Sequence, residues 1–185
     1  MIKTIEKLKE MRFLNRKKML WLFLICVFPI HFWAILIFLN NLSWLLESGI
    51  WFVLGVFSYQ LLLAFLEAFL MFVFLVLLSP WLPKTWSEDI KIMFLGNLAW
   101  VAWMGLIITQ YLSPNLMKFE IVLLIAGGIT VAIFITVQYF SLKNTSIARV
   151  HLDIFNRIQI LAHLFLGFDV LGFLFILMRN IFWIR

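Results

Sequence analysis

The feature of this chain that most limits how it can fold is a series of long apolar runs separated by short charged clusters. Hydrophobic residues make up 65% of its 185 positions, and charged residues make up only 13%. A water-soluble domain of this size cannot bury so much apolar surface in a single core. Because a helix of ~20 apolar residues crosses the hydrocarbon layer of a bilayer, the runs predict an integral membrane protein.

The predicted fold is a single all-α bundle of five transmembrane helices, residues 19–185, behind a basic amphipathic helix over residues 1–18. In that first segment, charged residues separate apolar residues at helical spacing, which is typical of a helix that lies on the membrane surface. The spans are expected at about residues 19–39, 49–79, 90–112, 117–142 and 158–178.

Two features of the pattern refine these boundaries. The first span is longer than the roughly 7–15 apolar residues of a signal peptide and has no small-residue cleavage pattern after it, so we expect it to be retained. The polar segment 143–157 has a helical stripe of its own, so it is expected to join the fifth span as one long helix.

The basic residues predict the orientation. Seven of the fifteen Lys and Arg residues precede position 19. With the amino terminus inside, the inner loops add five more, and the outer segments carry Lys118, Arg179 and Arg185. The positive-inside rule therefore places the amino terminus in the cytoplasm and the carboxyl terminus on the other side, in the plasma (inner) membrane if the cell is bacterial.

Three ionisable side chains on three predicted spans fall at one level in the bilayer. His31, Glu67 and Asp169 each lie twelve residues from the inner end of their span, roughly 18 Å deep at 1.5 Å per residue, and Thr130 falls near the same level. An ionisable group at this depth costs about 2.5–3.5 kcal/mol on insertion scales, so each needs a reason. Two neighbouring carboxylates cannot both stay ionised easily, so a converged cluster could relay protons or hold a cation.

The alternative is that these groups only form hydrogen bonds between helices. Glu67 shares a stripe with Gln60 beside the small residues Ala64 and Ala68, so that face is expected to point into the protein. His163 shares a stripe with Gln159, and a packing role is favoured over a ligand role there. The expected depths of His31 and His163 in the bilayer differ by about 9 Å of helical rise, which argues against a haem held by both.

The polar segment after the fourth span offers a different chemistry. Guanidinium groups at a membrane surface can grip phosphate oxygens, so this segment could bind lipid headgroups, although a solvated, positively charged helix start is favoured. The candidate headgroup ligands are Lys143, Arg149, His151 and Arg157.

The leading functional interpretation is a small non-enzymatic membrane protein that packs against partner proteins or lipids, as a subunit of a complex or as a homo-oligomer. The first alternative is a proton- or cation-coupled carrier or channel component that uses Glu67, Asp169 and His31. The second is an enzyme acting on a membrane lipid or lipid-linked phosphate. No catalytic residue, metal site, cofactor or nucleic-acid partner is predicted, and the one cysteine, Cys26, excludes an intrachain disulfide.

Overall fold

The computed structural model describes residues 14–112 and 120–182, and these residues form helices and turns with no strand among them. Four helical stretches are long and apolar enough to cross a membrane, and a further apolar segment, Gly127–Lys143, is shorter. The described part of the chain is thus all-helical, as predicted. Most of the amphipathic helix expected over residues 1–18 lies outside the described residues, and the last three positions of that range belong to the first described helix.

The described helices follow the predicted spans closely. One exception is a six-residue helix, α3, which lies between the first and second predicted spans. The sequence also predicted that the fifth span joins the polar segment before it as one helix. The 38-residue helix α7 confirms this prediction. The elements are α2 (Arg16–Asn40), α3 (Leu42–Glu47), α4 (Ile50–Leu78), the 3₁₀ turn η1 (Ser79–Trp81), α5 (Glu88–Leu112), α6 (Glu120–Lys143) and α7 (Thr145–Phe182).

Local chemistry explains where these helices begin. Gly49, between α3 and α4, has a φ of 92°, a left-handed conformation that glycine adopts without strain. At the start of α5, the Ile90 N–H donates to the Ser87 side-chain oxygen (3.3 Å), and two acidic residues occupy the first turn, where the helix dipole favours negative charge. At the start of α7, the Ser146 N–H donates to the Asn144 side-chain oxygen (2.9 Å).

The chain divides into two compact units. Unit 1 comprises Met1–Leu22 and Phe74–Asn156, and unit 2 comprises Phe23–Val73 and Arg157–Arg185.

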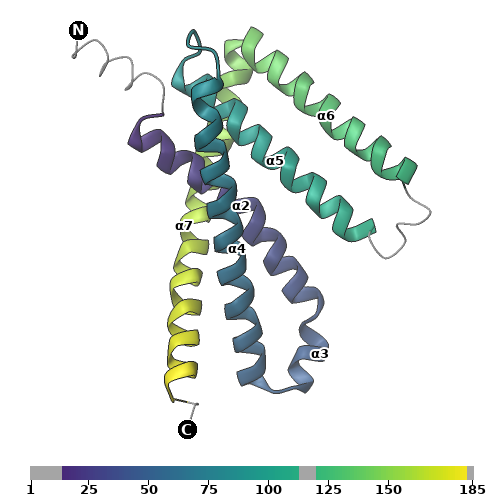
Figure 1. The fold of residues 1–185 in the computed structure, drawn as a ribbon, viewed down its shortest axis with the longest axis vertical. Helices are drawn as coiled ribbons and strands as arrows, with labels where there is room; N and C mark the ends of the chain where they lie inside the picture. Colours follow the sequence, from purple (N-terminus) through teal and green to yellow (C-terminus); the bar gives the residue numbers. More distant parts are fainter. Residues whose placement is uncertain (1–13, 113–119, 183–185) are drawn as a thin grey trace. The chain divides into compact units, whose positions relative to one another are not determined.

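In unit 1, α5 and α6 lie side by side (Figure 1). The Phe94 and Phe134 rings meet edge to face across this contact, with centroids 5.5 Å apart. The Asn97 side-chain amide donates to the Gln138 side-chain oxygen at 3.1 Å. An aromatic contact and an amide hydrogen bond therefore hold α5 against α6.

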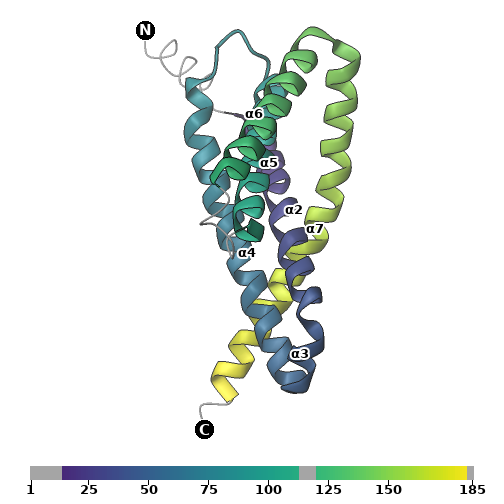
Figure 2. The same cartoon turned by 90° about the vertical axis from the view of Figure 1, so that its right-hand side faces the viewer.

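Unit 2 contains the larger parts of α2, α4 and α7, with α3 linking α2 to α4. Figures 1 and 2 show α4 and α7 running antiparallel in this unit. The core is apolar, and α2 supplies much of it through Leu24, Ile25, Val27 and Ile30, all at most 2% exposed. The α4 and α7 backbones approach closely at one point, where a Cβ on Gly172 would lie 3.4 Å from the Ser58 Cα. Small residues permit such an approach between helices in a membrane.

Candidate functional site

The most distinctive polar feature of unit 2 is a buried pair between α2 and α7. The His31 side chain is fully buried, and its Nε2 lies 2.9 and 3.0 Å from the two carboxylate oxygens of Asp169. Its Nδ1 lies 2.9 Å from the carbonyl oxygen of Val27, one turn earlier in α2. The Phe165 ring is stacked on the imidazole, with centroids 5.7 Å apart. The imidazole is thus held on both nitrogens and covered on one face.

These contacts define what the pair can do chemically. A carbonyl oxygen only accepts hydrogen bonds, so Nδ1 of His31 must carry a proton and donate to Val27. The contact between Nε2 and Asp169 then holds a second proton, which is either on the ring or on the carboxyl group. Both arrangements give a pair with no net charge, in which each ring nitrogen has a partner, as an apolar interior requires.

Glu67 lies apart from this pair. Its side chain is exposed on α4, and within residues 14–112 and 120–182 it makes no hydrogen bond or ion pair. The expectation that the Glu67 side chain points into the protein is therefore wrong, because it is not covered by the other helices of unit 2. The packed side of α4 runs through Leu61, Ala64 and Ala68, which are at most 3% exposed. Glu67 precedes Ala68 by one residue and so lies about 100° around the helix from it.

The neighbouring amide behaves as a packing residue. Gln60 is half-buried, and its side-chain nitrogen donates to the Ala34 carbonyl oxygen of α2 at 2.7 Å. Two of the three predicted mid-membrane groups, His31 and Asp169, are therefore brought together, and the α4 amide makes a separate contact with α2. Thr130 is half-buried on α6 and belongs to unit 1.

The polar stripe on the fifth predicted span is only partly covered. His163 is exposed, and its Nδ1 lies 2.7 Å from the carbonyl oxygen of Gln159 in the preceding turn. Gln159 is half-buried, and in the described part of the chain its side-chain nitrogen has no hydrogen-bond partner. The exposed His163 imidazole therefore satisfies one nitrogen within its own helix, and the other nitrogen has no hydrogen-bond partner among the described residues.

The candidate headgroup ligands are dispersed along α6 and α7. Lys143 is exposed and donates to the Tyr139 hydroxyl at 3.2 Å, and Arg149 is exposed. His151 is half-buried, hydrogen-bonds to Ser141 at 3.2 Å and contacts the Phe155 ring. Arg157, in unit 2, is also exposed. Among the described residues, no group of three or more His, Cys, Asp or Glu side chains is placed to hold a metal ion.

Two polar features were not singled out in the sequence. The Asn97–Gln138 contact joins α5 to α6, and its signal is a side-chain amide within each of two apolar helices. The second is Arg179, which lines a cavity in unit 2 together with the first turn of α4. Its signal is a cation that directly follows the apolar run of the fifth predicted span. Compared with known proteins, the chain matches no family model, no curated protein and no solved structure.

Proposed function

We propose that this protein crosses the membrane five times, with its amino terminus in the cytoplasm, and that it acts as a self-associating subunit of a membrane complex. Four described helical stretches have the length and apolarity of spans, and α6 supplies the apolar segment for a further crossing. The distribution of twelve basic residues on the inner segments and three on the outer segments supports this orientation.

The observation that carries the subunit role is the outward position of Glu67. It lies only three residues past the middle of α4, and the flanking outward side chains, Leu63, Leu66 and Leu70, are apolar and exposed. A carboxyl group that faces lipid at this depth costs about 2.5–3.5 kcal/mol on insertion scales. Ionisable residues within spans almost always face protein or a water-filled cavity, so Glu67 calls for a covering partner.

His163 provides the complementary group. Glu67 follows Ser58 by nine residues, and His163 precedes Gly172 by nine residues, where Ser58 and Gly172 mark the closest approach of antiparallel α4 and α7. Nine residues correspond to about 14 Å of rise and two and a half turns. Glu67 and His163 therefore lie equally far from that crossing, in the same direction, and each on the side of its helix that faces away from it.

This arrangement favours a second copy of the chain as the partner. Copies that share one orientation in a membrane present their Glu67 and His163 side chains at matching depth. The carboxyl group of one copy can then meet the free imidazole nitrogen of the next. Such a contact is head to tail, because each copy contributes a different surface, and contacts of this kind build a ring when the rotation between copies closes.

The test uses the purified chain in a mild detergent, with its mass measured by native mass spectrometry. The wild-type chain is expected to be oligomeric. Glu67→Leu and His163→Leu should each raise the dissociation constant at least about tenfold. An equimolar mixture of the two variants should recover dimers, because one Glu67 and one His163 remain available for a single head-to-tail contact.

Glu47→Gln is the matched control, because it removes an exposed carboxylate that lies at the end of α3, outside the apolar part of the helices. It should assemble as the wild type does. A wild-type chain that is monomeric throughout, or Glu67→Leu and His163→Leu variants with unchanged assembly, would rule out the proposal.

A further inference from the structure

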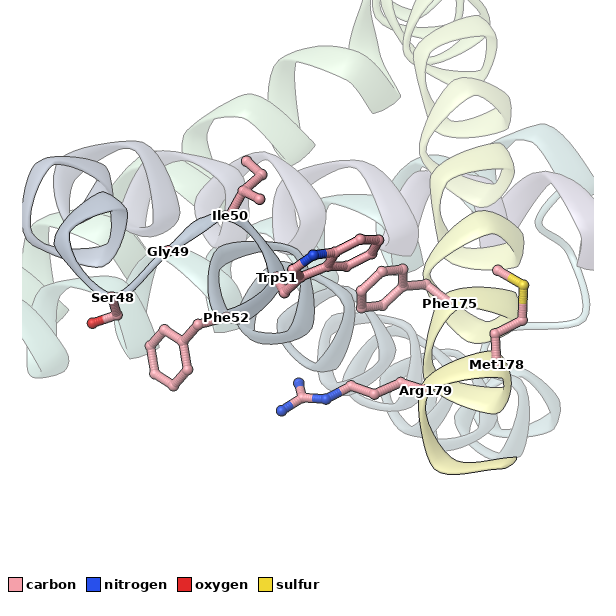
Figure 3. A pocket seen from close by; sticks show the side chains of 8 residues that line it. All are labelled: Ser48, Gly49, Ile50, Trp51, Phe52, Phe175, Met178 and Arg179. Carbon is pink, nitrogen blue, oxygen red and sulfur yellow. The ribbon is translucent and has the colours of Figure 1, made fainter. Parts of the chain in front are cut away.

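A cavity of about 560 Å³ lies in unit 2, where the first turn of α4 faces the last turns of α7. Figure 3 shows its lining side chains. Most are apolar, and the wall contains Trp51 and Phe175, whose rings are stacked with centroids 6.1 Å apart and planes inclined by 15°. A volume of this size lies within the range of roughly 300–1,000 Å³ that is typical of small-molecule sites.

One cation enters this apolar cavity. The Arg179 side chain extends from α7 toward the start of α4 (Figure 3). A Cβ on Gly55 would overlap its guanidinium group, so the missing side chain at Gly55 provides the space in which the guanidinium lies. Within the described residues, Arg179 forms no salt bridge, and no acidic residue lines the cavity. The guanidinium thus keeps its full hydrogen-bonding capacity toward a ligand.

The start of α4 adds to the positive potential of the cavity. The helix starts at Ile50, and the first N–H groups that donate to a backbone acceptor in this turn are those of Phe52 and Val53, both to the Gly49 carbonyl oxygen, so the N–H groups of Ile50 and Trp51 lie ahead of them. The first N–H groups of a helix have no acceptor within the helix, and the positive end of the helix dipole lies there. This effect is secondary to the Arg179 charge, but it has the same sign.

We propose that this cavity binds one anionic amphiphile, with its carboxylate or phosphate on the Arg179 guanidinium and its acyl chain along the Trp51–Phe175 wall. A guanidinium binds either anion through two parallel hydrogen bonds, and an apolar wall beside a single cation fits a molecule with one charged end. The cavity lies at the ends of α4 and α7, which the proposed five-span arrangement places at headgroup level. The inference rests on that placement and not on self-association.

The test measures binding to the purified full chain in neutral detergent by native mass spectrometry. Oleate probes the carboxylate, dioleoyl phosphatidate probes the phosphate, and dioleoyl phosphatidylcholine serves as the lipid without net charge. The wild-type chain should retain one molecule of at least one anionic probe in preference to phosphatidylcholine. Arg179→Gln should weaken that binding at least about tenfold, because the charged partner of the anion is removed.

Two further variants separate the site from general charge effects. Lys84→Gln removes one exposed positive charge elsewhere and should bind the probe as the wild type does. Gly55→Ala keeps every charge but displaces the guanidinium, so it should also weaken binding, and it decides the question if Arg179→Gln fails to fold. If neither anionic probe binds, or if the folded Arg179→Gln or Gly55→Ala variant binds with full affinity, the inference is overturned. The affinities of the wild type and the variants can be compared in any oligomeric state. This test is therefore independent of whether the chain self-associates.

Discussion

Replacing His31 with alanine is expected to lower the free energy of unfolding by about 3 kcal/mol, because it removes one partner of a buried ionisable pair. The change leaves the Asp169 carboxyl group, 10% exposed, without the imidazole that contacts both of its oxygens. Loss of an average interhelical hydrogen bond in a membrane protein costs only about 0.6 kcal/mol. The difference between these two values combines the cost of the unpaired carboxyl group with that of the cavity left by the buried imidazole. It can be measured by reversible unfolding in mixed detergent micelles.

Two companion variants isolate the cost of the unpaired carboxyl group. Asp169→Asn keeps a side-chain amide that can donate to Nε2 of His31, so it should destabilise the protein by less than about 1 kcal/mol. The double variant His31→Leu with Asp169→Leu should recover most of the lost stability, because no polar group is then left unpaired. Equal losses for His31→Ala and Asp169→Asn would show that the pair contributes only an ordinary hydrogen bond.

Gly172→Leu is expected to destabilise the protein by about 2 kcal/mol through overpacking of the α4–α7 crossing. A Cβ at this position would lie 3.4 Å from the Ser58 Cα and 3.5 Å from its carbonyl oxygen, which is ordinary van der Waals contact. Gly172→Ala should therefore be tolerated. The longer leucine side chain has no room, so the two helices must separate and lose their close packing. Thermal unfolding in detergent, followed by circular dichroism, measures the difference.

Gly167 is the matched control on the same helix. Apart from its chain neighbours and the nearby backbone of its own helix, no atom lies within 4 Å of a Cβ built there, so Gly167→Leu should leave the unfolding midpoint close to that of the wild type. The same loss at both positions would attribute the effect to the glycine substitution in general and would contradict a specific crossing at Gly172.

The helices could be predicted from sequence because a span requires a certain length and apolarity, both of which are read along the chain. The predicted span 49–79 corresponds to α4 over Ile50–Leu78, and the predicted span 90–112 corresponds to α5 over Glu88–Leu112. The short helix α3 was missed because six residues carry too little periodicity to distinguish a helix from a turn.

The candidate site was harder to predict, because helix contacts depend on neighbours that periodicity does not reveal. The depth count brought His31 and Asp169 to one level, but the contact between α2 and α7 became known only from the structure. For Glu67, the stripe of Gln60 and small residues indicated the packed side of α4, and Glu67 lies just beyond its edge. Arg179 was counted only as an outer charge, since its place above Gly55 depends on how α4 and α7 pack.

The most direct test of the five-span arrangement is the accessibility of single cysteines to a membrane-impermeant thiol reagent in intact cells. Cys26 is the only cysteine and is buried, so Cys26→Ala provides the background. Exposed positions in three connections, Ser48, Thr85 and Asn144, can each be changed to cysteine. Five spans with the amino terminus inside predict labelling from outside at Ser48→Cys and no labelling at Thr85→Cys or Asn144→Cys until the membrane is opened. Labelling of Asn144→Cys from outside would show that α5 and α6 do not both cross the membrane. Labelling of Ser48→Cys and Thr85→Cys from the same side would show that α4 does not cross it.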